Sequence, residues 1–281
     1  NRIRTAKINV LLVGGTGVGK SSTISALFQD YGNGQKSQAK VGQTASPETM
    51  DVSAHELDNL VIWDTPGLGD STEKDFEHQR KIVDLLKKTG PDGKPLVDLI
   101  FLVLDAGSRD FSSAYTLIKD VVLPNLDTAD RKRLLIGINQ ADMALKGRHW
   151  DNKEGKPEPK LVERLDELVQ TVKSRIKNDT DLDVEPIYYV AGYKDGDEVQ
   201  KPYNLQKLLS FILERLPEKK RATVAEHINQ KQENFASNDD KEDYSAKVET
   251  SVLSSIASYA KEVLDEVYEK AKKFATDPEV I

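Results

Sequence analysis

The stretch that decides the fold is Lys7–Thr23, which reads KINVLLVGGTGVGKSST. Its first part, Ile8–Val13, is an apolar run with the length of a buried strand, and a glycine-rich turn follows it. Gly14–Ser21 within this turn has the spacing G-x-x-x-x-G-K-[ST], the pattern of a loop that binds phosphates. A strand, this loop and a helix beginning at Lys20 occur in the order that the motif requires, so an ordinary glycine-rich turn is the weaker interpretation.

Each residue type in this loop has a chemical purpose. Glycines permit backbone angles that turn successive N–H groups toward an anion, and the following helix adds the positive end of its dipole. Lys20 is predicted to reach the β- and γ-phosphates, and the hydroxyl of Ser21 is a natural ligand for Mg²⁺. The residues expected around the phosphates are Gly15, Thr16, Gly17, Val18, Gly19, Lys20, Ser21 and Ser22.

The composition narrows the classes of function. The chain has 281 residues and a net charge of −7, which gives no overall attraction to nucleic acid or to anionic membranes. It has no cysteine, so it forms no disulfide framework, and a cytoplasmic location is expected. Its apolar runs are too short for a transmembrane segment. The chain starts at Asn1 rather than Met, so whether its true N-terminus is present stays open.

Short apolar runs alternate with helical patterns, which predicts an α/β fold with a mostly parallel six-stranded sheet between two helical layers. Strands are expected at Ile8–Val13, Met50–Leu57, Leu60–Trp63, Val97–Leu104, Arg133–Ile138 and Pro186–Val190. Helices are expected at Lys20–Phe28, Phe76–Lys88, Phe111–Val122, Leu161–Ile176 and Leu205–Leu216. The polar stretch Gln29–Glu48 is predicted to be a long mobile loop, and residues 144–160 a surface excursion.

The composition changes after Pro217, which predicts a nucleotide-binding domain over residues 1–217 and a C-terminal helical region over residues 218–281. Residues 218–244 are polar. Apolar residues then recur every three or four positions over Ser245–Phe274, the pattern of one long amphipathic helix. This helix could dock on the domain, pair with another copy or contact a partner, and docking is slightly favoured.

Two further motifs follow predicted strands. Asp64–Gly67 (DTPG) places a carboxylate where it can hold Mg²⁺ and a glycine N–H where it can face a γ-phosphate. Asn139–Asp142 (NQAD) places Asp142 where it can accept hydrogen bonds from the N1–H and exocyclic amine of guanine, a donor pair that adenine lacks. Asn139 is expected to tie this segment to the phosphate loop.

The remaining base contacts are predicted next to these motifs. They are Gln140, Met143 and the backbone of Ala191 and Gly192, where an N–H could meet the guanine oxygen.

Together these motifs resemble those of translation-factor-type GTPases, in particular the TrmE–Era–EngA–septin-like class. The stretches GGTGVGKSST, VIWDTPGLGD and INQADMALKGRHW are most similar to bacterial Era-like proteins of the 50S ribosome-binding GTPase type, and the resemblance covers residues 7–217. It implies a P-loop NTPase G domain that binds GTP or GDP with Mg²⁺ and hydrolyses GTP. It also implies a possible homodimer through the G domain, or a protein or ribosome effector.

The resemblance also implies a threonine that ligates Mg²⁺ and lies near the γ-phosphate. Thr44 and Thr49 are the candidates, with Thr49 ranked first because it precedes a predicted strand. Lys20, Thr49 and Gly67 are then the predicted catalytic residues, and Ser21, Thr49 and Asp64 the predicted metal ligands.

Three positions depart from the family pattern. Gln140 replaces the usual lysine, and Leu68 stands where a water-orienting glutamine occurs in Ras-like enzymes. Gly17 replaces the asparagine of potassium-activated relatives. A slow intrinsic rate is therefore expected, raised by dimerisation or a partner, with Arg109 as a weak candidate for an arginine supplied to another copy. The alternatives are a GTP-gated switch or assembly module with negligible hydrolysis, and an ATPase, which Asp142 disfavours.

Overall fold

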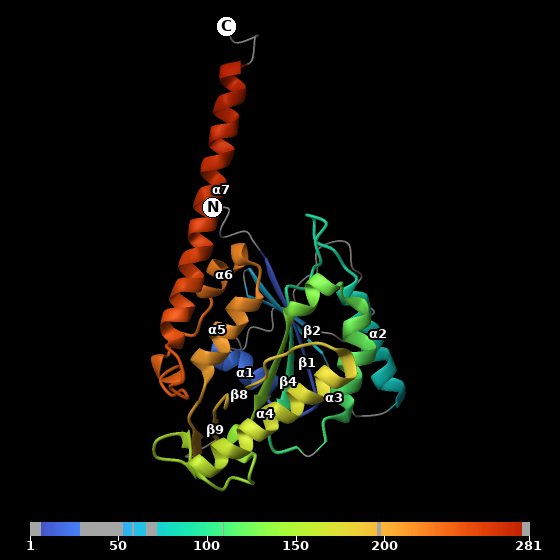
Figure 1. The fold of residues 1–281 in the computed structure, drawn as a ribbon, viewed down its shortest axis with the longest axis vertical. Helices are drawn as coiled ribbons and strands as arrows, with labels where there is room; N and C mark the ends of the chain where they lie inside the picture. The colour runs from blue at the N-terminus through green and yellow to red at the C-terminus, as the bar shows by residue number, and fades with distance from the viewer. Residues whose placement is uncertain are drawn as a thin grey trace.

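A six-stranded sheet with the order β2-β3-β1-β4-β5-β8 forms the centre of the protein (Figure 1). Its strands are β1 (Ile8–Gly14), β2 (Ser53–Leu57), β3 (Leu60–Asp64), β4 (Leu99–Asp105), β5 (Leu134–Asn139) and β8 (Ile187–Tyr188). Strand β2 pairs antiparallel with β3, and every other neighbouring pair is parallel. The computed structural model describes residues 7–28, 53–57, 59–65, 72–108, 110–195 and 198–276. The predicted mostly parallel sheet is confirmed.

The central strands are buried because their apolar side chains alternate between two covered faces. Every residue of β1 is buried: Ile8, Val10 and Leu12 face one hydrophobic cluster, while Leu11 and Val13 face the other. A strand that is apolar on both faces can only be covered by helices on both sides of the sheet. The continuous apolar runs of the sequence therefore determine the layered architecture.

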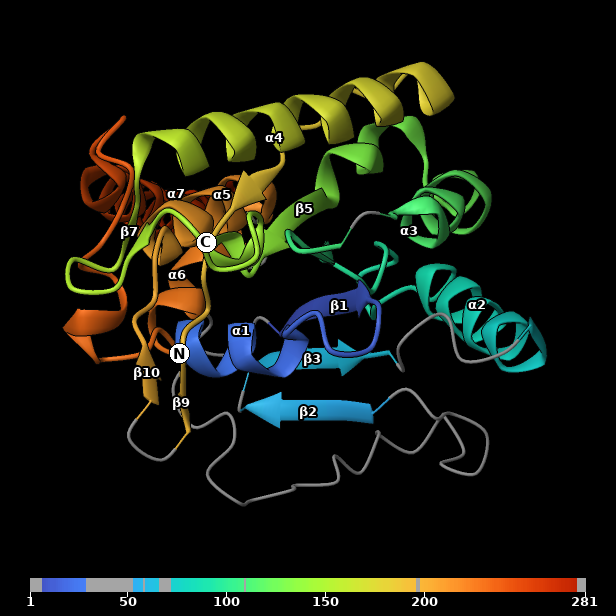
Figure 2. The same ribbon diagram turned by 90° about the horizontal axis from the view of Figure 1, so that it is seen from below.

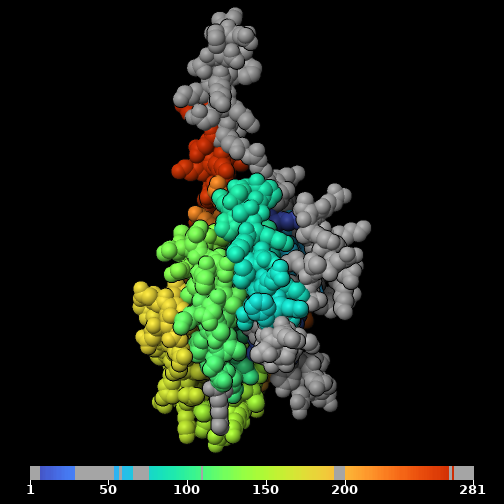
Figure 3. Space-filling view, turned by 90° about the vertical axis from the view of Figure 1, so that its right-hand side faces the viewer, coloured from blue at the N-terminus to red at the C-terminus, as the bar shows by residue number. Residues whose placement is uncertain are grey.

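Helices cover the two faces of the sheet (Figure 2). The first cluster contains residues from α1 (Lys20–Leu27) and α5 (Leu205–Arg215). The second contains residues from α2 (Thr72–Leu86), α4 (Pro159–Thr180) and the π-helical segment η3 (Leu117–Val122). On the surface of this second face, α2 and the segment α3–η3 lie side by side, with α3 at Ser112–Thr116 (Figure 3). The predicted three-layer αβα fold is confirmed.

Several segments differ from the sequence prediction. The helix expected over Phe111–Val122 is divided into α3 and η3, which differ in hydrogen-bonding pattern. The excursion at residues 144–160 contains a small hairpin, in which β6 (Trp150–Asp151) pairs with β7 (Lys156–Pro157) and Trp150 is buried. A second hairpin pairs β9 (Tyr193–Asp195) with β10 (Glu198–Gln200). The remaining elements are short 3₁₀ helices at Leu123–Asn125, Thr128–Arg133, Ala141–Met143 and Gln232–Asn234.

The C-terminal region begins with a helix that the polar composition concealed. Helix α6 (Glu218–Ala225) buries Ala222 and Val224, and Val224 belongs to the same cluster as α1 and α5. The ammonium group of Lys220 donates to both carboxylate oxygens of Asp98 at 2.8 Å, at the amino-terminal end of β4. A helix this polar is stabilised by these tertiary contacts, which its sequence pattern does not show.

Helix α7 (Tyr244–Thr276) matches the predicted long helix closely. Its first half packs on α5 and α6: Val248 and Val252 contact the hydrophobic cluster, and the hydroxyl of Ser255 accepts from the backbone N–H of Ala222 at 3.0 Å. Its second half extends past the amino-terminal end of β1 (Figure 1). Docking is therefore confirmed for the first half of the helix. Among the described residues, none of the helices combines the length and apolarity that crossing a membrane requires.

Candidate functional site

The phosphate loop lies between β1 and α1, as the sequence predicts, and two of its glycines are required by close contacts. A Cβ atom at Gly14 would lie 2.4 Å from the backbone oxygen of Val103 in the neighbouring strand. Gly19 has φ +87°, and a Cβ atom there would lie 2.3 Å from Nδ2 of Asn139. A side chain at either position would push the loop away from the strand ends that hold it.

Lys20 occupies the centre of the loop. Its ammonium group donates to the backbone oxygens of Gly14 at 3.0 Å and Gly15 at 3.1 Å. Partial burial lowers the pKa of Lys20, and the negative charge of Asp64 acts in the opposite direction. The loop residues Thr16, Gly17, Ser21 and Ser22 are exposed, whereas Val18 is buried. The loop therefore presents its polar atoms outward, around a fixed positive charge.

Asp64 ends β3 beside this charge. Burial raises the pKa of its carboxyl group, while the charges of Lys20 and His55 lower it. One carboxylate oxygen, Oδ1, is buried and makes no hydrogen bond within the described part of the chain. A buried carboxylate oxygen without a described partner, beside the loop lysine that precedes the exposed Ser21, fits a hard cation that prefers oxygen ligands. These residues are therefore suited to hold Mg²⁺ bound together with a nucleotide.

Asn139 joins three motifs that are far apart in the sequence. Its Nδ2 donates to the backbone oxygen of Val18 at 2.9 Å, and its Oδ1 accepts from the backbone N–H of Ala191 at 3.0 Å. The expected link between Asn139 and the phosphate loop is thus present. Gln140 adds a second link, because its Nε2 donates to the backbone oxygen of Gly17 at 2.9 Å. Gln140 therefore supports the phosphate loop from the position where the family has a lysine.

Asp142 lies in the 3₁₀ turn that follows β5 and is buried. Burial raises the pKa of its carboxyl group, and the nearby charge of Asp105 raises it further. Met143 is 44% exposed next to it. Gly192 has φ +79°, and a Cβ atom there would lie 2.8 Å from the backbone oxygen of Gln200. The structure thus places the predicted base-contacting residues at the carboxyl-terminal edge of the sheet, beside the phosphate loop.

Some predicted residues cannot be placed. Thr44, Thr49, Gly67, Leu68 and Arg109 lie outside the described residues, as does the predicted mobile loop Gln29–Glu48. The described site therefore consists of the phosphate loop, Asp64, and the two segments that follow β5 and β8.

Sequence reasoning missed residues that support the site. Asp105 ends β4, and its Oδ1 accepts from the backbone N–H of Gly107 at 2.8 Å. The sequence did contain a signal for Asp105, because this residue directly follows the apolar run Val97–Leu104, just as Asp64 follows Leu60–Trp63. The hydroxyls of Thr23 and Tyr189 lie 2.8 Å apart and join α1 to the segment after β8. Nothing in the sequence pattern pointed to this pair, because it depends on how α1 packs.

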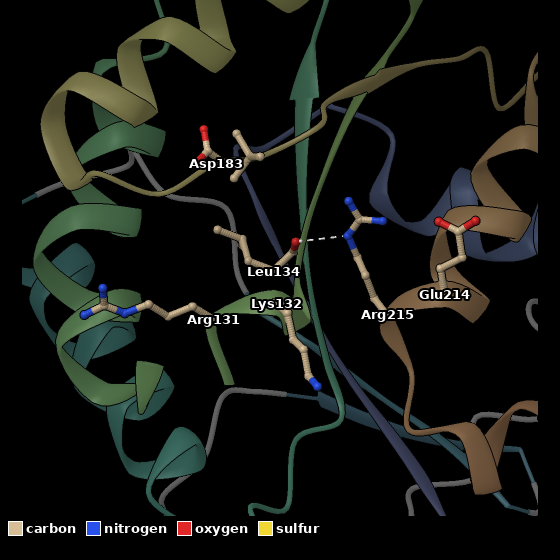
Figure 4. A pocket seen from close by; sticks show the side chains of 7 residues that line it. Arg131, Lys132, Leu134, Asp183, Glu214 and Arg215 are labelled. Atoms are coloured by element: carbon tan, nitrogen blue, oxygen red, sulfur yellow. Dashed lines mark hydrogen bonds between the residues drawn. The ribbon is translucent and has the colours of Figure 1, made fainter. Parts of the chain in front are cut away.

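A cavity of about 290 Å³ lies at the opposite end of the sheet, next to the first residue of β5. Its charged lining consists of three cations and two carboxylates: Arg131, Lys132, Arg215, Asp183 and Glu214. These side chains point in different directions rather than toward one point (Figure 4), and Arg215 Nε donates to the backbone oxygen of Leu134 at 3.3 Å. The cavity is therefore separate from the nucleotide site and shows no convergent set of ligand-binding groups.

A family of known proteins matches the part of the chain that contains most of the site motifs. Residues 9–140, which carry the phosphate loop, DTPG and the start of NQAD, match a family model described as 50S ribosome-binding GTPase. Over these residues, slightly less than half of the chain, the protein is similar to P-loop GTPases.

Curated relatives match different lengths of the chain. A "Translocase of chloroplast 101, chloroplastic" of Physcomitrium patens is 36% identical over 104 residues, 36% of this chain and 11% of that protein. An "Interferon-gamma-inducible GTPase 10" of Mus musculus is 23% identical over 220 residues, 78% of this chain and 46% of that protein. The chain thus spans from about a tenth to less than half of the length of these relatives.

Solved structures with a similar arrangement include a probable GTP-binding protein engB, with 16% identity and a TM-score of 0.41, covering 74% of this chain and 97% of that one. Another is titled for the dimerisation and GTPase activity of the chloroplast translocon components atToc33 and psToc159, with 17% identity and a TM-score of 0.43, covering 75% and 83%.

Proposed function

We propose that this protein binds GTP together with Mg²⁺ and hydrolyses it slowly, with a rate that dimerisation or a partner raises. The observation that supports this proposal best is Asn139, which holds the phosphate loop through Val18 and the segment after β8 through Ala191. Together with Gln140, which contacts Gly17, it holds the NQAD segment against the phosphate loop. A guanine ring and a polyphosphate belonging to one molecule could then be bound at the same time.

The proposed roles of the site residues concern the phosphates, the metal ion and the base. Lys20 and the loop amides would stabilise negative charge on the transferring phosphoryl group. Ser21 and Asp64, with Thr49 or Thr44, would hold Mg²⁺, which neutralises phosphate charge. Asp142 would select guanine, because adenine would leave the buried carboxylate without its hydrogen-bond donors.

Leu68 supports the slow rate, because an aliphatic side chain cannot orient water by hydrogen bonding. The same residue favours the alternative function, a GTP-gated switch or assembly module in which hydrolysis is negligible. Membership of the TrmE–Era–EngA–septin-like class, a cytoplasmic location, a G-domain dimer and a protein or ribosome effector are further parts of the proposal.

The rate of GTP turnover tests the proposed hydrolysis and the role of a dimer. We expect GTP hydrolysis that requires Mg²⁺, that is lost in Lys20→Ala, and whose rate per molecule rises with protein concentration. A fast turnover that does not depend on protein concentration would contradict the role of a dimer. If light scattering showed that the protein self-associates in the presence of GTP while no GTP is hydrolysed, the alternative function as a switch would be favoured.

Base selectivity is tested with Asp142→Asn, which should lose GTP affinity and gain affinity for xanthosine triphosphate, because an amide matches the changed donor and acceptor pattern of xanthine. If the variant instead kept its preference, or if ATP competed equally well for the wild type, guanine would not be the base.

A further inference from the structure

The outward face of α7 is apolar although it faces solvent. Leu253, Val263, Leu264 and Tyr268 are 57%, 47%, 68% and 67% exposed, and Ile256 is 44% exposed. Single exposed apolar residues are common on protein surfaces, but a contiguous set on one helix face marks an interaction site. We call this set, with the exposed residues Ala257 and Ala260 between its members, the outer stripe.

Most of the outer stripe, at Leu253, Ala257, Ala260 and Leu264, lies opposite the face that holds α7 on the domain, and Ile256 and Val263 flank it on the side of Val252. Ser251 and Ser255 are buried on the inner face, and Glu262 forms an ion pair with Lys219 of α6 at 2.7 Å. The members of the stripe follow each other at intervals of three and four residues, from Leu253 to Leu264. This spacing keeps them on one side of a helix, and Glu262 belongs to the other side.

Within the part of the chain that the structure describes, the stripe stays exposed. Helix α7 has 33 residues, whereas the helices that support it, α5 and α6, have 11 and 8. At 1.5 Å per residue α7 is about 50 Å long, far longer than the helices beneath it. Isolated helices are only marginally stable in water, so tertiary or quaternary packing usually stabilises them.

We propose that the outer stripe is the contact through which two copies of this chain pair, α7 against α7, with the helices antiparallel. A two-fold axis between Ser258 and Tyr259 would place Ala257 opposite the partner's Ala260, and Leu253 opposite the partner's Leu264. Small residues would then meet small residues, which lets the helices approach closely, and leucines would pack on either side.

The surface area of the stripe and the helix dipoles support a second copy of the chain as the partner. Five large side chains that each expose on the order of 100 Å² would remove roughly 1,000 Å² from water in a dimer, the lower limit for a specific interface. The interface is self-complementary and closes with two copies, and antiparallel helices align their dipoles favourably. Because the stripe lies far from the carboxyl-terminal ends of the strands, this dimer would form with or without nucleotide.

Sedimentation of the full chain tests the contact. We expect the mass of a dimer at micromolar concentrations, equally with GDP and without nucleotide. Leu264→Glu should weaken dimerisation at least tenfold, because it places a charge in the stripe, while circular dichroism and GDP binding stay unchanged. The control is Lys119→Glu, which reverses an exposed charge on η3, on the other face of the sheet, and should leave the mass unchanged. A monomeric wild type, or a dimer that Leu264→Glu does not weaken, would overturn the proposal.

Disulfide cross-linking tests the antiparallel direction, because the chain has no cysteine of its own. Leu253→Cys and Leu264→Cys should each stay uncross-linked alone and form a disulfide when the two variants are mixed. The two positions are 11 residues apart, about 16 Å along a helix, which is beyond the reach of a disulfide between identical positions of antiparallel copies. Efficient cross-linking of either variant alone would contradict the antiparallel arrangement.

Discussion

Gln140 shows how a single replacement can keep part of a family residue's role. Its side-chain amide reaches Gly17 in the phosphate loop from a backbone conformation with φ +58°. An uncharged amide supplies one hydrogen bond where a lysine would add positive charge near the phosphates. The loop is therefore supported, while the electrostatic contribution to nucleotide binding is reduced.

Shortening this side chain isolates its contribution. Gln140→Asn tolerates positive φ but cannot reach Gly17, so GDP binding should weaken by about three- to tenfold, the value of one hydrogen bond. Gln140→Lys should bind GDP at least as tightly as the wild type. Isothermal titration measures both, with the exposed Gln170→Asn on α4 as a control that should leave affinity unchanged. Equal affinities for Gln140→Asn and the wild type would show that the contact does not support binding.

Asp142 should make nucleotide binding depend on pH. Burial and the charge of Asp105 raise the pKa of the Asp142 carboxyl group, so it takes up a proton at a higher pH than an exposed aspartate. The protonated acid is a poorer acceptor for the guanine donors, so GDP affinity should fall as pH is lowered toward this raised pKa. In Asp105→Asn the fall should begin at a lower pH, because one of the charges that raises the pKa is gone. Superimposable pH profiles of GDP affinity would refute the effect of Asp105.

At the scale of elements, α6 is attached to the sheet through a buried charge. The carboxylate of Asp98 is 3% exposed, accepts from the backbone N–H of Asn9 at 2.9 Å, and is neutralised by Lys220. Asn9 in turn accepts through its Oδ1 from the indole N–H of Trp63, next to Asp64, at 3.1 Å. A series of polar contacts thus connects α6 to Asp98 before β4, to Asn9 of β1 and to Trp63 of β3.

Removing the cation should leave a buried charge without a partner. Lys220→Met should lower the free energy of unfolding by about 3 kcal/mol or more, and adding Asp98→Asn should recover part of the loss. Lys219→Met is the matched control, since it removes a half-exposed ion pair with Glu262 and should cost less than about 1 kcal/mol. Urea unfolding measures all three, and equal losses for the two lysine variants would contradict the role of Asp98.

At the scale of the whole molecule, the C-terminal region completes the helix that follows the phosphate loop. The backbone N–H of Asn229 donates to Leu27 at 2.9 Å, and its side chain donates to Ser25 at 3.2 Å. The side chain of Asn234 donates to Ala26 at 3.0 Å. These bonds satisfy carbonyl groups at the end of α1 that no residue within the helix can reach. The region after Pro217 is therefore part of the support of α1.

Truncation tests how far this support extends. A chain ending at Pro217 loses these bonds and Lys220, so its free energy of unfolding should fall by about 5 kcal/mol or more, comparable with the total stability of many domains. A chain ending at Tyr259 keeps α6 and the docked half of α7 and should be nearly as stable as the full chain. Thermal unfolding compares them, and a 1–217 chain as stable as the full chain would show that the predicted boundary separates independent units.

The sequence by itself determined the layered fold and the positions of the site motifs. Runs such as Ile8–Val13 and Val97–Leu104 are apolar on both faces, and such strands are stable only between helical layers. Each site motif is a short run of residues directly after one strand, as in Gly14–Ser21 and Asp64–Gly67. Such motifs can be recognised in the sequence because all their residues are close together in the chain. The predicted end of the last helix, Phe274, lies two residues before the end of α7 at Thr276. The prediction was this close because the apolar periodicity continues over many turns.

Only the tertiary structure decided which distant residues meet. The pairing of Lys220 with Asp98, the capping of α1 by Asn229 and Asn234, and the placement of Asp105 beside Asp142 depend on packing between elements, which leaves no regular spacing in the sequence. The same holds for α7: its periodicity predicted an amphipathic helix, but not which of its residues would pack on α5 and α6. An apolar side chain has the same spacing whether its neighbour is the domain core, a second copy or water.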